Sequence, residues 1–322
     1  FINEPNGFWS LTEGNYNLWR DMTLCFYKRL KKNKMLDKVQ LIGADLAIWT
    51  PAEVPWQKEA SRDINLGLYD IHTYPSKITV NSGEYSKIIK AYRDAVPEGK
   101  KIVMGEVGLK FVEPADSLYQ QESQRRAAAL SYASMDDSQM FIFDYMYGTD
   151  MADVLMQTAN SGFSGCVAWM LDDAMHSAEK PDKLKMWGFW NIFGDEFFGT
   201  EQEKIRPWFY SWSLLSRYMP AGSNIYKTEV KGNPYIKALA VEKGGKRVVV
   251  LLNVSKKPQT VKLTGDVVLQ KSKTYLYAEG HLKLSEDEML LPETKNVTVD
   301  LYDGITVKMP GESMWLVTDF DY

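Results

Sequence analysis

The chain has 322 residues, of which 38 are Lys or Arg and 42 are Asp or Glu, giving a formal net charge of −4. This slight acidity, without a basic cluster, argues against a nucleic acid or an anionic membrane as partner, and no apolar run approaches the roughly 20 residues of a membrane span. Two cysteines and three scattered histidines predict neither a disulfide framework nor a metal centre. The composition is that of a globular protein rich in aromatic side chains.

The first half of the chain alternates apolar runs with longer helical patterns. Near-continuous apolar runs are typical of strands buried on both faces, as in a parallel sheet. Strand followed by helix, repeated in this order, predicts βαβ units. Strands are expected at 39–47, 66–72, 101–106 and 165–171, with Phe1-Ile2 as the end of one more, and helices at about 14–33, 82–95, 116–134, 138–160 and 203–218.

The second half changes to short, β-branched segments separated by turn signals, which predicts an antiparallel sandwich of about eight short strands. Nine of the ten Trp precede residue 221, and Pro220-Ala-Gly-Ser223 is typical of a linker at that break. We therefore expect an α/β domain at 1–221 and an all-β domain at 222–322. The clearest strand candidates in the second half are 235–241, 247–254, 259–263, 273–277, 297–302 and 313–318.

Two glutamates stand out by position. Glu4 follows the first strand fragment, and Glu106 ends the strand predicted at 101–106. In a parallel α/β barrel the carboxyl ends of the strands meet at one mouth, where chemistry is placed. A pair of carboxyl groups from different strand ends is what cleavage of a glycosidic bond requires, one as proton donor and one ionised. Position alone leaves open that each is simply a solvated carboxylate.

The segments around these glutamates resemble glycoside hydrolase clan A. The segment 1–9 contains Asn-Glu-Pro, which is similar to the clan's acid/base signature at barrel strand 4, and its extension Asn-Gly-Phe-Trp resembles family 39. The segment 104–108 (Met-Gly-Glu-Val-Gly) resembles the nucleophile segment of strand 7, with family 5 as the nearer match. The segments 70–75 and 167–169 resemble the His-x-Tyr element of strand 6 and the aromatic end of strand 8.

This resemblance covers roughly residues 1–220 and implies a TIM (β/α)8-type barrel followed by an all-β antiparallel sandwich domain. A complete barrel takes about 250 residues, and only strands 4 to 8 are visible in the sequence. An open sheet of five strands would expose hydrophobic edges. We therefore expect barrel strands 1–3 to be supplied by sequence upstream of Phe1, with a half-barrel closed by another chain as the alternative.

The resemblance also implies roles for the individual residues. Glu106 would be the nucleophile and Glu4 the acid/base, with their carboxyl groups about 5–5.5 Å apart. Asn3 would hydrogen-bond the 2-hydroxyl of the sugar. His72 or Tyr74 would hold Glu106 ionised by donating a hydrogen bond, which lowers its pKa. Glu4, desolvated beside Trp9 and close to a second carboxylate, would then have the higher pKa of the pair.

Further residues are expected to contact the sugar. The resemblance places Trp169 at the floor of the site, and Trp49 and Trp187 lie in loops after strands, where an aromatic face could stack on a pyranose. Each Trp could equally pack in a hydrophobic core. Asp172, just beyond the last strand of the first half, is a candidate partner for a sugar hydroxyl.

The leading hypothesis is a retaining β-glycosidase that acts on an oligo- or polysaccharide, with no metal or organic cofactor and with carbohydrate as its partner. The resemblance favours a secreted or periplasmic location. The alternative from another functional class is a non-catalytic carbohydrate-binding protein on a degenerate hydrolase barrel. A third reading, an unrelated α/β enzyme with a coincidental Asn-Glu-Pro, would place Glu4 and Glu106 far apart.

Overall fold

The computed structural model describes residues 2–173 and 182–321, which form two compact units. The first unit contains Phe1–Val112 and Gln157–Trp169, and the second contains Glu113–Met156 and Met170–Tyr322. Residue 221 lies inside the second unit, so the division into 1–221 and 222–322 stays a prediction. Among the described residues, no helix is both long and apolar enough to cross a membrane.

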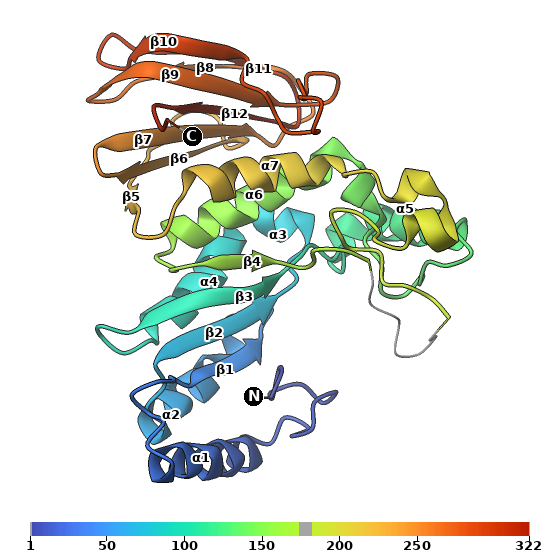
Figure 1. The fold of residues 1–322 in the computed structure, drawn as a ribbon, viewed down its shortest axis with the longest axis vertical. Helices are drawn as coiled ribbons and strands as arrows, with labels where there is room; N and C mark the ends of the chain where they lie inside the picture. Colours follow the sequence, from blue (N-terminus) through green and yellow to red (C-terminus); the bar gives the residue numbers. More distant parts are fainter. Residues whose placement is uncertain (1, 174–181, 322) are drawn as a thin grey trace. The chain divides into compact units, whose positions relative to one another are not determined.

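The first unit is built on a parallel sheet whose four strands follow one another in chain order (Figure 1). These are four of the strands expected from the apolar runs, and the expected α/β organisation with a parallel sheet is confirmed. The sheet is open in the described part of the chain, where no closed barrel is seen. The strands are β1 (Ile42–Ala47), β2 (Leu68–Thr73), β3 (Lys101–Val107) and β4 (Cys166–Ala168).

The strand fragment expected at Phe1-Ile2 is not found. Ile2 is buried but lies outside any strand, and Phe1 lies outside the described residues. The reason is local, because Glu4 adopts a left-handed backbone conformation with φ 47° and Pro5 has no N–H to donate to a sheet. The N-terminal segment is therefore a series of turns beside the sheet.

In the first unit, α1 precedes β1, α2 connects β1 to β2, and α3 and α4 connect β2 to β3. Helix α1 begins after Asn15, whose side chain accepts a hydrogen bond from the backbone N–H of Leu18 at 3.1 Å, and it ends with three basic residues that complement the helix dipole. The expected helices at 14–33 and 82–95 are present as α1 and α4, whereas α2 and α3 were not predicted. The bounds are α1 Tyr16–Lys32, η1 Pro51–Glu53, α2 Val54–Asp63, α3 Lys77–Asn81 and α4 Glu84–Asp94.

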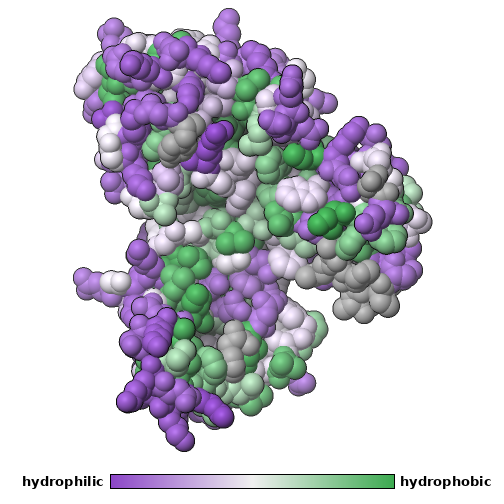
Figure 2. Space-filling model, in the orientation of Figure 1, coloured by the Kyte–Doolittle hydropathy of each residue, from purple (hydrophilic) through white to green (hydrophobic). Residues whose placement is uncertain are grey.

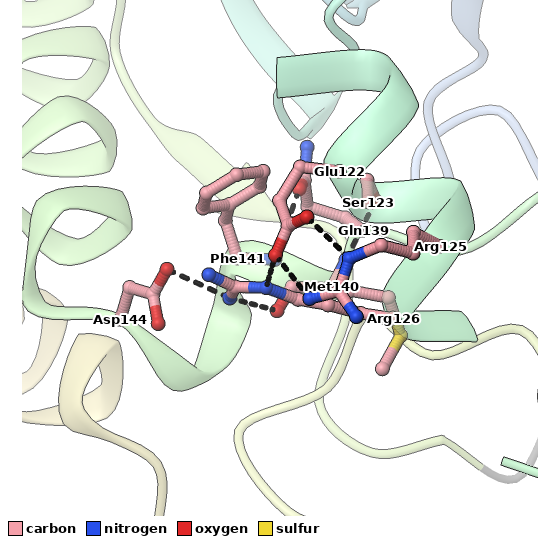
Figure 3. Close-up of polar contacts among 8 residues, drawn as sticks. All are labelled: Glu122, Ser123, Arg125, Arg126, Gln139, Met140, Phe141 and Asp144. Carbon is pink, nitrogen blue, oxygen red and sulfur yellow. Dashed lines mark hydrogen bonds and ion pairs between the residues drawn. The ribbon is translucent and has the colours of Figure 1, made fainter. Parts of the chain in front are cut away.

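In the second unit, an arginine network holds α5 against the short turn η3 (Figure 3). The Arg126 side chain pairs with Glu122 and Asp144, each at 2.8 Å, and its guanidinium lies 4.5 Å from the Phe141 ring centre. The helix expected at 138–160 is thus divided into η3 and α6, the latter shared by both units. The bounds are η2 Pro114–Asp116, α5 Ser117–Ala128, η3 Met140–Phe143, α6 Tyr145–Asn160, η4 Gly194–Phe198, η5 Thr200–Gln202 and α7 Pro207–Tyr218.

The second unit also contains two antiparallel sheets, as the second half of the sequence predicts. A six-stranded sheet has the order β10-β9-β12-β7-β6-β5, and β11 pairs with β8. Val307 and Met309 of β11 pack in one core cluster with Ile236 and Leu251 of the larger sheet, so apolar side chains from both sheets share this core. The strands are β5 Asn224–Tyr226, β6 Ile236–Lys243, β7 Lys246–Asn253, β8 Gln259–Leu263, β9 Val268–Tyr277, β10 Thr294–Asp300, β11 Ile305–Met309 and β12 Ser313–Thr318.

Candidate active site

The carboxyl ends of three neighbouring strands bring polar side chains together. Ala47 of β1 is in register with His72 of β2, and His72 is in register with Glu106 of β3. Parallel strands end at the same edge of a sheet, so residues far apart in the sequence meet there. Tyr74, two residues beyond His72, donates a hydrogen bond from its hydroxyl group to Glu106 Oε1.

The N-terminal segment is fastened to this edge by side-chain hydrogen bonds. Asn6 behaves like a strand partner of Ala47: its Nδ2 donates to the Ala47 carbonyl at 2.7 Å, and its Oδ1 accepts from the Ala47 N–H at 2.9 Å. Thr12 Oγ1 donates to the Pro5 carbonyl at 2.7 Å. These contacts hold Glu4, one residue before Pro5, over the ends of the strands.

Glu4 and Glu106 approach each other closely. One carboxylate oxygen of each and one ring nitrogen of His72 all lie within 4.8 Å of one another. The carboxyl groups of retaining glycosidases are roughly 5–5.5 Å apart, and those of inverting enzymes roughly 6.5–9.5 Å. The nearest oxygens of the two groups are thus close to one another, as a pair of carboxyl groups acting on one bond requires. Both side chains are largely buried, with 13% of Glu4 and 14% of Glu106 exposed.

His72 lies between carboxylates on both sides of its ring. Its Nε2 is 2.9 Å from Asp45 Oδ1, and its Nδ1 is 3.3 Å from Glu4 Oε1 and 3.6 Å from Glu106 Oε2. Burial lowers the pKa of His72, but hydrogen bonds to Asp45 and Glu4, together with the charges of Asp45 and Glu106, outweigh burial and raise the pKa to about 10. The ring is therefore an imidazolium at neutral pH.

Burial raises the pKa of Glu106 above its ordinary value. The hydrogen bond from Tyr74 and the positive charge of His72 lower the pKa, as expected from the sequence, but they do not outweigh burial and the neighbouring charges of Glu4 and Asp45. The expected lowering by Tyr74 and His72 is thus present, and burial sets the net direction of the pKa shift. Burial likewise raises the pKa of Asp70 to about 6.

Two groups of side chains offer ligand atoms close enough to hold a metal ion. One is Glu4 with His72 and Glu106, and the other is Asp45 with Asp70 and His72, each with its ligand atoms within 4.8 Å. Both groups share His72, which binds a metal only when a ring nitrogen is deprotonated. A metal ion bound by either group would therefore have to displace a proton from His72, whose pKa is about 10.

Aromatic side chains line an open groove beside Glu4. Trp9 Nε1 donates to Glu4 Oε2 at 2.7 Å, and its ring lies 6.0 Å from that of Trp49 and 4.9 Å from that of Phe8. The groove has a volume of about 210 Å³. Phe8, Trp9 and Trp49 are 83%, 50% and 45% exposed, and Figure 2 shows hydrophobic surface around the N-terminal segment.

The other two expected site residues of the first unit, Asn3 and Trp169, lie next to the segments that carry Glu4 and Glu106. Asn3 is exposed and directly precedes Glu4. Trp169 is half-buried and follows β4, where its backbone N–H donates to the Val107 carbonyl at 2.8 Å. Trp169 thus follows the end of the strand beside the one that carries Glu106.

Asp172 and Trp187 belong to the second unit. Asp172 is half-buried and forms a β-bridge with Trp190. Trp187 is 1% exposed, its Nε1 donates to the Asp137 carbonyl at 3.0 Å, and its backbone N–H donates to Asp173 Oδ1 at 2.7 Å. A buried ring offers no face to a sugar, so this position supports packing rather than the expected stacking.

Sequence reasoning missed Asp45 and Asn6 as members of the site, whereas Trp9 was expected beside Glu4. Asp45 carried a signal, because a carboxylate inside an apolar run predicted to be buried needs a partner. Trp9 is part of the Asn-Gly-Phe-Trp motif, yet its contact with Glu4 depends on the turns between them. The clamp that Asn6 forms on Ala47 depends on the fold, and no local pattern indicates it.

Solved structures of other proteins resemble this fold, although the sequence itself has no match. No family model and no curated protein matches the sequence. Similar solved structures include a family 30 subfamily 8 xylanase from Clostridium acetobutylicum (TM-score 0.60, 13% identity, covering 99% of this chain and 65% of that one). A second is an α-L-arabinofuranosidase from Thermotoga maritima (TM-score 0.61, 14% identity, covering 98% of this chain and 64% of that one). A third is a family 39 β-xylosidase from Caulobacter crescentus (TM-score 0.55, 14% identity, covering 98% of this chain and 65% of that one).

The chain spans slightly less than two thirds of the length of these three structures. The match extends over nearly all of the present chain, so it includes both the parallel and the antiparallel sheets. The resemblance seen in the sequence is confirmed at this level: the chain has the fold of clan A glycoside hydrolases.

Proposed function

We propose that the chain carries the catalytic pair of a retaining O-glycosyl hydrolase that cleaves β-glycosidic bonds in oligo- or polysaccharides. The observation that carries this proposal is the approach of Glu4 and Glu106 oxygens to within 4.8 Å at the edge of the parallel sheet. This close approach supports direct attack by a carboxylate, the arrangement of retaining enzymes, over attack by a water molecule held between more distant carboxyl groups.

Glu106 is the proposed nucleophile. Its carboxylate attacks the anomeric carbon while Glu4 protonates the leaving oxygen, and Glu4 then removes a proton from the water that hydrolyses the glycosyl-enzyme. The Tyr74 hydroxyl and the His72 imidazolium favour the ionised form of Glu106. Asn3 is proposed to contact the 2-hydroxyl and Trp169 to form the floor of the site, whereas the expected contact of Asp172, which belongs to the other unit, stays a prediction.

The aromatic groove is proposed to hold the leaving group. Trp9 contacts both Glu4 and the ring of Trp49, so the groove borders the residue that protonates the leaving oxygen. Exposed aromatic faces suit the apolar face of a pyranose. This arrangement favours a substrate whose leaving group is itself a sugar.

We also propose that further strands complete a barrel. An open parallel sheet leaves unpaired backbone groups at its edges, and parallel sheets are normally covered on both faces. Ile42 of β1 and Val167 of β4 are 55% and 58% exposed, although both are apolar. A crystal structure of the protein should show additional strands paired with β1, from the same chain or from another. Continued exposure of that edge would contradict the proposal.

The test of the function is hydrolysis of an aryl β-xyloside, a choice guided by the xylanase and β-xylosidase among the similar structures. Proton NMR during the first turnovers identifies the anomer released first, and retention predicts the β-anomer. Release of the α-anomer would contradict the retaining mechanism. Binding of xylo-oligosaccharides without hydrolysis of this or other aryl glycosides would instead support the carbohydrate-binding alternative.

Trp49→Ala is expected to raise KM for xylobiose by up to about tenfold, because it removes a stacking surface of roughly 0.5–1.5 kcal/mol on the leaving-group side. The KM for β-xylosyl fluoride should stay unchanged, because fluoride places nothing in the groove. Leu118→Ala is a suitable control, because Leu118 is 77% exposed and lies in the other unit. An equal rise in KM for both substrates would show that Trp49 contacts the transferred sugar or supports the site as a whole.

A further inference from the structure

We propose that Asp45 is a positioning residue that holds His72 as a doubly protonated imidazolium between Glu4 and Glu106. The inference deepens the proposed function and rests on it for its catalytic consequence. Its structural part can be tested without any measurement of hydrolysis. Asp45 is at the far side of the His72 ring from the two glutamates, so it acts on them through His72.

Both ring nitrogens of His72 face carboxyl oxygens, and this geometry favours two N–H donors. Nε2 is 2.9 Å from Asp45 Oδ1, while Nδ1 is 3.3 Å from Glu4 Oε1 and 3.6 Å from Glu106 Oε2. A neutral imidazole has one N–H and one lone pair. When the facing carboxyl groups are ionised, either neutral tautomer would place a lone pair against a carboxylate, and the imidazolium is the form that makes both contacts favourable.

Asp45 is well placed to enforce this state. It belongs to β1 within an otherwise apolar strand, its side chain is 23% exposed, and the side chain of His72 is 7% exposed. A carboxylate removed from water is stable only when it is paired, and the pair with His72 meets that need. The pKa of His72, raised to about 10 by Asp45 and Glu4 against the effect of burial, agrees with the geometry.

Carboxyl groups face His72 from each element around it. Glu4 approaches from the N-terminal segment, Asp45 from β1, Asp70 from the same strand β2, and Glu106 from β3. Asp70 also accepts a hydrogen bond from the Gly105 N–H at 2.8 Å. Loss of the proton from His72 would leave these carboxyl groups without their nearest positive charge and would raise the pKa of Glu106.

Asp45→Asn is the direct test, because the amide oxygen still accepts a hydrogen bond from Nε2 while the negative charge is lost. The imidazole signals are followed by NMR between pH 5 and 10. The chain has three histidines, and His72→Gln identifies the signal of His72. The expected result is a His72 signal that stays protonated through pH 8 in the wild type and titrates at least one pH unit lower in Asp45→Asn.

Two outcomes would overturn the proposal. One is a wild-type His72 that titrates near the ordinary pKa of about 6.5. This measurement is made on the wild type and does not depend on the folding of any variant. The other is a folded Asp45→Asn variant with an unchanged His72 titration. Asp45→Glu, which keeps the charge, should keep His72 protonated through pH 8 and separates loss of charge from loss of packing.

The catalytic consequence is measured by the pH dependence of kcat. In Asp45→Asn, kcat should fall above the pH at which NMR shows His72 losing its proton, with KM little changed, whereas the wild type should show no such step below pH 8. A uniform loss of kcat at every pH would indicate a purely structural role and contradict the proposal. Absence of hydrolysis in the wild type would refute the proposed function and leave the NMR result to decide the role of Asp45.

Discussion

Glu106→Gln is expected to lower kcat/KM for an aryl β-xyloside by about 10⁴-fold or more, the scale seen when a covalent nucleophile is removed. An amide cannot ionise and does not form the glycosyl-enzyme. The fold should be preserved, because the amide oxygen can still accept the hydrogen bond that Tyr74 donates to Glu106. The measurement compares wild type and variant at saturating and low substrate concentrations.

The matched control is Glu98→Gln, because Glu98 is exposed in the turn before β3 and in the same unit. A 2-deoxy-2-fluoro xyloside with a good leaving group should label wild-type Glu106 and leave Glu106→Gln unlabelled, as mass spectrometry of the peptides would show. Label on another carboxylate would assign the nucleophile elsewhere.

The pH dependence of the wild type provides a second check on the same residue. The nucleophile must be ionised, so kcat/KM should fall as the pH drops through the pKa of Glu106. Burial raises that pKa. The fall of kcat/KM on the acid side of the pH profile (the acid limb) should therefore have its midpoint above the ordinary glutamate pKa of about 4.3. An acid limb at or below that value would contradict the buried environment of Glu106.

The sequence was sufficient to locate the strands that carry the site. The runs at 66–72 and 101–106 are mostly apolar, and nearly all residues of these two strands are buried or half-buried, which is why His72 and Glu106 could be placed at neighbouring strand ends. The motif Asn-Glu-Pro indicated Glu4 correctly as a residue near them, although the local structure is a turn rather than a strand. The glycine and proline residues in and after this motif do not distinguish a turn from the end of a strand.

What could not be predicted depends on contacts between distant segments. The charge state of His72 is set by Asp45 and Glu4, which lie 27 and 68 positions earlier in the chain. Burial, the largest effect on the pKa of Glu106, is likewise a property of the folded unit. Trp187 and Trp49 both follow predicted strands, yet one is 1% and the other 45% exposed, and composition alone does not separate a stacking Trp from a core Trp.

Glu4→Ala is expected to affect substrates according to their leaving group. For xylobiose, whose leaving alcohol needs a proton, kcat/KM should fall by about 10²–10⁴-fold, the usual contribution of general acid catalysis. For a dinitrophenyl β-xyloside the first step needs little protonation, so kcat/KM should fall far less. The second step should become slow, because no base activates the water, and the glycosyl-enzyme should accumulate.

Azide distinguishes this mechanism from general damage to the site. It attacks the glycosyl-enzyme without needing a base, so it should restore turnover of the dinitrophenyl xyloside by Glu4→Ala and yield the β-xylosyl azide. Glu59→Ala, at an exposed position on α2 in the same unit, should respond to azide as the wild type does. An equal loss of activity on both substrates, with no effect of azide, would remove Glu4 from the acid/base role. Because Trp9 donates to Glu4 Oε2 at 2.7 Å, such a result would leave Glu4 as a support for the aromatic groove.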